Sequence, residues 1–310
     1  MSSFSDEAVE KLVRAGEIAA KVRDSSAGLV RPGASAREVC EKVEGLIRDM
    51  GAVPAFPCNF SVNEVAAHYT PGIDDDVKLV GMEVVKVDIG VAVDGYIADT
   101  AVTVDLSGLY ERLLEASKAA LERVVAIMKP NVRIYDIGRT VESTIRSYGF
   151  KPIRNLTGHT IDRWRIHAGT QIPNYPDRTT FHRRLKPGTL VAVEPFATNG
   201  RGFVREGGIT NIYSYTGRRG KYKLSNIEEE ILQYIIDNYR TLPFTPRWLL
   251  QKFKPEEIKP AIKSLVAKGI LYNYPILVEA SKGMVSQFEH TFLILKDRVI
   301  VTTCPECNTQ

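Results

Sequence analysis

The sequence has no uninterrupted apolar run near the roughly 18 residues that a membrane-spanning helix needs, and its first residues are polar and acidic. It has only four cysteines in 310 residues, at 40, 58, 304 and 307, too few for the framework of a small secreted protein. These absences argue against secretion and membrane spanning. They predict a reducing, cytoplasmic compartment.

The chain also has little excess of charge of one sign. The net charge of +4 is the difference between 41 basic and 37 acidic residues, and by itself it excludes no class of partner. Residues 201–270, however, carry 13 Lys+Arg against 7 Asp+Glu, whereas the rest of the chain carries 28 against 30. The positive excess therefore lies in one segment.

The ordinary content of 44% hydrophobic and 25% charged residues excludes disorder, collagen and coiled coil.

An internal repeat organises the chain. Residues 31–54 align with residues 129–152 at an offset of 98, and Pro, Val-Glu, Ile-Arg, Gly and Pro coincide. Each copy predicts a proline-marked loop, an amphipathic helix and a glycine stop, preceded by a longer helix. At an offset of 106, Val84–Asp88 matches Leu190–Glu194, so each half predicts a strand that ends in a carboxylate. Chance similarity is the alternative, but the repeat favours a pseudo-two-fold α/β domain with its site between the halves.

Residues 201–279 break this pattern. Helix starts at Ser225, Thr245 and Lys254, followed by a short strand pair at 271–278, predict an inserted winged-helix-like helical subdomain. The catalytic domain would then comprise residues 1–200 and 280–310, closed by strands at 287–295 and 298–303. The basic loop at 217–223 is predicted to be a solvated loop, with nucleic-acid contact as the alternative.

Two apolar runs joined by Asp94-Gly95 predict a β-hairpin. With a two-residue turn, Asp88 lies opposite Ala101, and Asp99 projects from the same face as Asp88. Two carboxylates on an apolar sheet repel each other unless a positive charge lies between them. An exposed, solvated sheet face is the alternative, but both runs are dominated by Val, Ile and Ala.

Further ligand types occur in or beside predicted strands: His159, Glu194 and Glu289. Four carboxylates and one imidazole suit two divalent cations such as Mn²⁺, Fe²⁺, Co²⁺ or Zn²⁺. Two metals about 3.5–4 Å apart, holding a hydroxide, are typical of hydrolases.

Six motifs occur in an order that resembles type 2 methionine aminopeptidase in its archaeal form. They are Asn63-Glu-Val-Ala-Ala-His-Tyr-Thr-Pro71, Lys86-Val-Asp-Ile-Gly90 with Asp94-Gly-Tyr-Ile-Ala-Asp-Thr100, Asn155-Leu-Thr-Gly-His-Thr160, Arg165-Ile-His-Ala-Gly169, Glu194-Pro-Phe-Ala-Thr198 and Phe288-Glu-His-Thr291. The resemblance covers nearly the whole chain, including the helical insertion. It implies the pita-bread fold, an internally duplicated α/β domain with a dinuclear metal centre, and removal of the initiator Met from nascent polypeptides whose second residue is small.

The resemblance also implies individual roles. Asp88 would chelate one metal, Asp99 and Glu289 would bridge both, and His159 with Glu194 would complete the other. Glu194 would also handle the proton in catalysis. His167 would stabilise the oxyanion, and His68 would contact the substrate near the scissile bond. The pocket for the Met side chain is predicted to comprise Phe56, Pro57 and Ile166. Because the chain begins Met1-Ser2, a second copy is predicted to remove Met1.

The remaining histidines and the C-terminal cysteines have plainer interpretations. His182 is predicted to lie at the surface. His290 is predicted to face away from Glu289 and to support the core rather than bind metal. Cys304-Pro-Glu-Cys307 is half of a zinc motif with no second half, and is predicted to be a tail without function, with redox chemistry or metal binding between subunits as alternatives.

Two other functions share this fold. A prolidase or aminopeptidase P relative would use the same ligands but cleave before proline. A non-catalytic relative would bind RNA or protein through the basic insertion, but such relatives lose metal ligands, and all five are present here.

The sequence predicts a monomer that acts on nascent N-termini and that docks on ribosomes through the insertion. It does not indicate the physiological metal.

Overall fold

A computed structural model describes residues 4–309. The predicted cleavage between Met1 and Ser2 by a second copy of the chain lies outside these residues. The α-helices are α1 (Asp6–Ala27), α2 (Ala36–Asp49), α3 (Glu111–Ile127), α4 (Ile134–Ser147), α5 (Asn226–Tyr239) and α6 (Pro255–Ala267). Short 3₁₀ helices are η1 (Arg178–Thr180), η2 (Pro246–Gln251) and η3 (Pro305–Thr309). None of the helices within residues 4–309 combines the length and apolar composition that crossing a bilayer requires.

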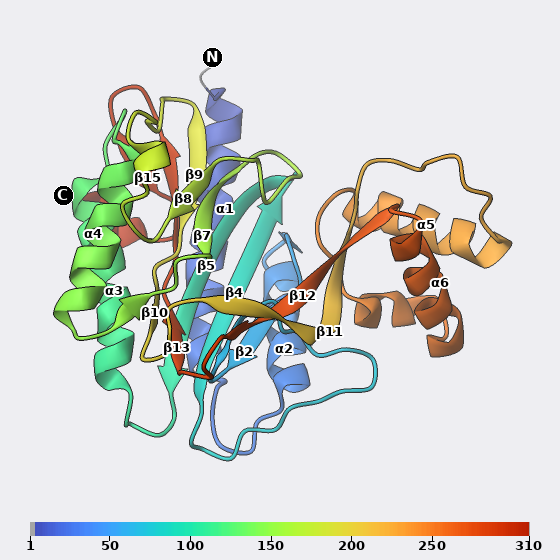
Figure 1. Ribbon diagram of the computed structural model, residues 1–310. Helices are drawn as coiled ribbons and strands as arrows, with labels where there is room; N and C mark the ends of the chain where they lie inside the picture. Colours follow the sequence, from blue (N-terminus) through green and yellow to red (C-terminus); the bar gives the residue numbers. More distant parts are fainter. Residues whose placement is uncertain (1–3, 310) are drawn as a thin grey trace.

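The strands form several small sheets (Figure 1). In chain order they are β1 (Val53–Pro54), β2 (Asn59–Val62), β3 (Val65–Ala67), β4 (Val84–Val93), β5 (Tyr96–Asp105), β6 (Lys151–Pro152), β7 (Thr157–Ile161), β8 (Gln171–Pro173), β9 (Thr189–Val193), β10 (Phe196–Thr198), β11 (Val204–Tyr215), β12 (Leu271–Glu279), β13 (Val285–Gln287), β14 (His290–Ile294) and β15 (Val299–Val301). The first half contributes the sheet β1-β4-β2 with β5 beside β4, and the second half contributes the sheet β15-β14-β9-β7-β8.

The duplication predicted from the sequence recurs in the helices. Helices α2 and α4 each have 14 residues, and both bounds differ by the offset of the sequence repeat. Their buried apolar positions match in pairs: Val39 with Ile137, Val43 with Val141, and Ile47 with Ile145. The spacing of four residues makes one apolar face on each helix. Each half therefore builds its core with the same helix design.

Helices α1 to α4 lie against the sheets of the two halves, whereas α5 and α6 lie apart from those sheets (Figure 1). Helix α1 packs along β4 and β5, whereas α3 and α4 pack on each other and on the short strands of the second half. Between the two sheets lies a further apolar cluster that includes Ile97, Ile161 and Leu293. The two halves are thus joined through a shared core as well as through the chain.

The hairpin β4–β5 has the predicted register, with Val93 opposite Tyr96 and Asp88 opposite Ala101. Asp94 and Gly95 both have positive φ, 49° and 82°, as a two-residue type I′ turn requires. The prediction that a strand ends at Asp88 is wrong, because β4 continues to Val93. Strong pairing along the whole hairpin extends the strand past the carboxylate.

The inserted segment differs from the prediction in two places. Residues 271–278 do not form a strand pair; they lie in the single strand β12, which pairs with β11 and with β3 of the first half. The segment after Thr245 forms the 3₁₀ helix η2 instead of an α-helix. A separate apolar cluster joins α5, η2 and α6, and Figure 1 shows these helices as a lobe beside the sheets. The prediction failed because β12 is set by pairing with distant segments, which the local sequence at 271–278 does not indicate.

A buried ion pair fastens this lobe to helix α2. Arg247 Nη2 lies 2.8 Å from Glu44 Oε1, and Trp248 Nε1 donates to Glu44 Oε2 at 2.7 Å. Glu44 and Arg247 are 1% and 7% exposed. Burial strengthens the attraction between the two charges, but removal of one partner would strongly destabilise the fold, because the other charge would stay buried without it.

The closing strands are shorter than predicted. The strand expected at 287–295 is divided into β13 and β14, and Glu289 lies between them in an isolated bridge to Ala101 of β5. This break brings Glu289 to the hairpin that carries Asp88 and Asp99.

Candidate metal centre and active site

Both carboxylates of the first half lie on the hairpin. Asp99 of β5 is 3% exposed, and Asp88 of β4 is partly exposed toward the same cavity. Thr291 holds the backbone of Asp99 from the other half, because its Oγ1 accepts from Asp99 N and donates to Asp99 O, each at 2.8 Å. Asp99 is therefore fixed by both halves.

The second half supplies the other three predicted ligands. His159 lies on β7, Glu194 directly follows β9, and Glu289 directly precedes β14. His159 Nε2 lies 3.6 Å from Asp99 Oδ2 and 3.8 Å from Glu194 Oε1. Ligand atoms of Asp99, His159 and Glu289 all lie within 4.8 Å of one another. Residues separated by up to 190 positions in sequence thus meet in one cluster.

Gln287 was not predicted to belong to the site. Its Nε2 donates to Glu194 Oε2 and to Glu289 Oε2, each at 3.2 Å. Gln287 and Glu289 are two positions apart, so alternation along an extended segment directs both to one face. That alternation is the signal from which Gln287 could have been predicted. Its amide orients two carboxylates that would otherwise repel.

The electrostatics of this cluster are those of a site built for cations. Burial raises the pKa of Asp88 to about 7. Burial, and then repulsion by Asp88 and Glu194, raises the pKa of Asp99 well above its usual range. Burial and neighbouring carboxylates raise the pKa of Glu194 and Glu289 in the same way. Burial also lowers the pKa of His159 to about 4, which keeps the ring neutral and able to bind a metal.

The unmatched hydrogen-bonding groups agree with a bound metal. Within residues 4–309, three carboxylate oxygens are buried without a hydrogen-bond partner: Asp88 Oδ1, Asp99 Oδ1 and Glu289 Oε1. Buried polar atoms are rarely left without a partner in native proteins, and each one costs about 1–3 kcal/mol. Oxygen and imidazole donors of this kind bind hard or borderline divalent cations. The residues present therefore fit the metal centre that the sequence predicted.

Two further histidines face this cluster. His68 has φ 67°, a left-handed conformation that a non-glycine residue adopts only where its surroundings hold it. Its Nδ1 donates to Pro275 O at 3.2 Å. The ring of His167 lies 4.4 Å from that of His159, centroid to centroid. The surrounding protein lowers the pKa of both His68 and His167, mainly through burial.

Tyr274 lies beside these rings and was not predicted from the sequence to belong to the site. Its ring lies 5.7 Å from that of His68 and 6.1 Å from that of His167. It is carried by β12, whose pairing with β3 brings it over the cavity. Since residues 271–278 were predicted to be a local strand pair, Tyr274 could not be placed there.

One cavity of about 700 Å³ is lined by all five predicted ligands and by both histidines. Phe56 and Ile166 of the predicted side-chain pocket also line it. Pro57 is not among the described residues that do; it is buried, and its carbonyl accepts from Asn59 Nδ2 at 3.0 Å. Asn59 itself lines the cavity. His182 is exposed, as predicted.

Sequence comparison places this geometry among known enzymes. Residues 10–294 match metallopeptidase family M24. The methionine aminopeptidase of Methanocaldococcus jannaschii is 46% identical over 297 residues, which is 96% of this chain and 99% of that protein. The methionine aminopeptidase of Saccharolobus solfataricus is 44% identical, over 97% of this chain and 99% of that protein.

Solved structures share the fold at low sequence identity. A thermophilic Arx1 has a TM-score of 0.84 at 18% identity, covering 97% of this chain and 91% of that chain. Methionine aminopeptidase from Thermotoga maritima has a TM-score of 0.69 at 22% identity, covering 98% and 99%. Prolidase from Pyrococcus furiosus has a TM-score of 0.58 at 19% identity, covering 97% and 65%.

These likenesses confirm the predicted pita-bread fold, which enzymes of different specificity share. The family match also agrees with the use of divalent metal, for which the carboxylate and imidazole cluster provides the donors. The chain belongs to metallopeptidase family M24.

Proposed function

We propose that the chain is a methionine aminopeptidase of type 2, in its archaeal form, which removes the initiator Met from nascent polypeptides with a small second residue. The observation that carries the proposal is the single cavity that brings together all five predicted ligands, His68 and His167. The methionine aminopeptidases of Methanocaldococcus jannaschii and Saccharolobus solfataricus are 46% and 44% identical to this chain over nearly its full length, which supports the specificity. The helical lobe between β11 and β12 supports the assignment to type 2.

Asp88, Asp99, His159, Glu194 and Glu289 would hold two divalent cations, of Co, Mn, Fe or Zn. When bound, two such cations supply the positive charge that activates water and polarises a peptide carbonyl. They would also stabilise the carboxylates, whose mutual repulsion otherwise favours protonation. Gln287 keeps Glu194 and Glu289 oriented through its two hydrogen bonds.

The remaining steps belong to the side chains. Glu194 would accept the proton of the attacking water and pass it to the leaving amine, a role that suits a carboxyl with a raised pKa. The neutral His167 would donate a hydrogen bond to the oxyanion that forms at the carbonyl. His68, held by the Pro275 carbonyl, would contact the substrate near the scissile bond. The Met side chain would lie against Phe56 and Ile166.

Cellular setting is part of the proposal. We propose a cytoplasmic monomer that docks on ribosomes through the basic residues of 201–279. In support, Arg218, Lys221 and Lys223 of the loop before α5 are exposed. Phosphate contacts of this kind weaken steeply with salt. Co-sedimentation with ribosomes should therefore fall between low and high ionic strength; absence of binding, or binding that salt does not change, would count against docking.

The specificity is tested with two tripeptides. Metal-stripped protein should regain hydrolysis of Met-Ala-Ser when Mn²⁺, Fe²⁺, Co²⁺ or Zn²⁺ is added, and should leave Ala-Pro-Ala intact. The Asp99→Ala protein, treated in the same way, controls for a contaminating peptidase. Preferential cleavage of Ala-Pro-Ala would instead indicate a prolidase or aminopeptidase P, and cleavage of neither would favour a non-catalytic relative.

A further inference from the structure

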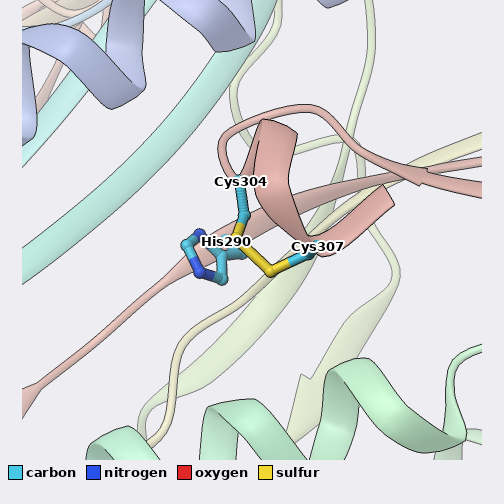
Figure 2. Close-up of side chains that lie close together, drawn as sticks. All are labelled: His290, Cys304 and Cys307. Carbon is cyan, nitrogen blue, oxygen red and sulfur yellow. A yellow bond between two sulfur atoms is a disulfide. The ribbon is translucent and has the colours of Figure 1, made fainter. Parts of the chain in front are cut away.

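The C-terminal cysteines form a feature that peptide hydrolysis does not use. Cys304 and Cys307 are joined by a disulfide across the start of η3. Figure 2 shows the ring of His290 beside this bond. Cys304 is 4% exposed, whereas Cys307 is partly exposed. The prediction of a tail without function did not anticipate that these residues pack against the strand that follows Glu289.

A cavity of about 900 Å³ opens onto the disulfide. Both cysteines, His290, Arg23 and Lys118 lie on its wall. None of the residues that line it also lines the cavity of the metal ligands. The disulfide can therefore be reached by a reagent from a side of the molecule that the peptide substrate does not occupy.

The turn that holds the two sulfurs does not depend on the disulfide alone. Asn308 Oδ1 accepts from Val301 N at 2.8 Å, and its Nδ2 donates to Val301 O at 3.1 Å. Cys307 N also donates to Cys304 O at 3.0 Å. These bonds would keep the two thiols close after reduction. Preorganised thiols re-form a disulfide readily, so opening and closing should be reversible.

The residue before Cys304 connects the turn to β14, the strand that Glu289 directly precedes. Thr303 Oγ1 accepts from Thr291 N at 3.0 Å, and it lies 3.0 Å from His290 Nδ1. Thr291 in turn holds both backbone groups of Asp99. Thr303 and Asp99 are thus connected through one residue, Thr291, by which a shift of Thr303 would reach Asp99.

A second connection runs through Arg23 of α1. Its Nη1 donates to Thr303 O at 2.9 Å and to Thr100 Oγ1 at 3.0 Å. Thr100 Oγ1 donates to Glu289 O at 2.8 Å. Both ligands predicted to bridge the metals, Asp99 and Glu289, therefore have their backbones tied to the segment that ends in the disulfide.

We propose that Cys304–Cys307 is a reversible thiol–disulfide exchange site for a dithiol, and that its state changes the affinity of the metal centre. A thiolate of the dithiol attacks the more exposed Cys307 Sγ, the S–S bond breaks, and Cys304 leaves as a thiolate and takes a proton. The second thiol of the dithiol then attacks the mixed disulfide and releases Cys307. The protein gains two electrons and two protons, and the dithiol becomes a disulfide.

The proposed cytoplasmic setting agrees with this assignment. Disulfides that form in a reducing cytoplasm are usually transient, and they serve catalysis or redox sensing. A loop closed between residues three apart also gains little from restriction of the unfolded chain, so the bond should be easier to open than one closing a long loop. The part of the proposal that concerns metal affinity rests on the proposed dinuclear centre, whereas the exchange step does not.

The test uses the folded full-length protein in buffers of oxidised and reduced dithiothreitol. Intact mass after alkylation should show two thiols that open and close together with the buffer ratio, while the buried Cys40 and Cys58 stay unlabelled. Mn²⁺ titration should give about 10-fold weaker binding to the reduced form, as for other changes beside metal ligands. Reoxidation should restore the affinity.

Two variants separate exchange from coupling. Cys304→Ser/Cys307→Ser should bind Mn²⁺ like the reduced protein in every buffer. Thr303→Val keeps the disulfide and the Arg23 contact to the Thr303 carbonyl but removes the hydroxyl contacts, so redox state should change its metal affinity less than it does in the wild type. A disulfide that no dithiothreitol ratio opens in the folded protein would overturn the exchange site. Equal Mn²⁺ affinity in both states would overturn the coupling, and an extra equivalent of Zn²⁺ held only by the reduced wild type would indicate a metal site instead. Failure of peptide hydrolysis alone would affect only the proposed function.

Discussion

Helices α2 and α4 have the same length and matched buried faces, yet the glutamate of their shared Val-Glu pair makes different contacts in each helix. In α2, Glu44 is buried and bonded to Arg247 of the inserted lobe. In α4, the matching Glu142 pairs with Arg146 and Arg154, whose side chains are 58% and 38% exposed. Duplication thus preserved the apolar face that folds each half, while the polar residues diverged to serve what each half contacts.

The predicted metal ligands also divide between the two halves. The first half supplies two aspartates from one hairpin, and the second supplies His159, Glu194 and Glu289 from separate elements. Neither half holds a complete set. Changes on either side should therefore disable one common centre, whereas changes in the helices should affect each half separately.

The largest effect is expected from the carboxylate that both halves hold. Asp99→Ala should abolish hydrolysis of Met-Ala-Ser and lower metal content, because two cations would lose their shared counter-charge. Circular dichroism should show a folded protein. Glu289→Ala, on the other half, should behave alike; full activity in either variant would contradict the shared centre.

The next largest effect separates the two helices. Glu44→Gln should lower the free energy of unfolding by about 3–5 kcal/mol, because it removes the buried carboxylate of Arg247 and leaves only the half-exposed Glu41, 3.6 Å away. Glu142→Gln, the matched control, should lower it by about 0–1 kcal/mol, because its partners are solvated. Urea unfolding of both proteins measures the difference. Equal losses would mean that the buried pair does not anchor the lobe.

His167→Ala tests a residue of the second half that is not a predicted ligand. It should lower kcat by about 10²–10³ with metal content unchanged, because an oxyanion donor acts in the transition state. Metal analysis and steady-state kinetics on the same sample distinguish this from a ligand role. Loss of metal as the main effect would make His167 a ligand.

The smallest effect should be the same in both halves. Ile47→Val and Ile145→Val each remove one buried methylene at matched positions that are 1% and 0% exposed. Each should cost about 0.5–1.5 kcal/mol of stability. Thermal unfolding of the two variants measures this, and values that differ by several kcal/mol would show that the matched faces are not packed alike.

Local sequence patterns were enough to predict much of the fold. The Asp94-Gly95 turn determined the register of β4 and β5, and therefore the common face of Asp88 and Asp99. Helical periodicity located α2 and α4. The pairing of β12 with β3, the break before β14, and the support from Gln287 depend on contacts between distant segments, for which one sequence has no local signal. His159, Glu194 and Glu289 were predicted as candidate ligands from their places in or beside predicted strands, whereas their individual roles came from the family resemblance.

The most direct test of the shared centre is the number of metal ions bound by single variants from each half. Calorimetric titration of stripped protein with Mn²⁺ should show two equivalents in the wild type. Asp88→Asn, in the first half, and His159→Ala, in the second, should each retain about one, and the double variant should retain none. If either single variant kept both equivalents, or if the double variant still bound one, the two halves would not build one dinuclear centre.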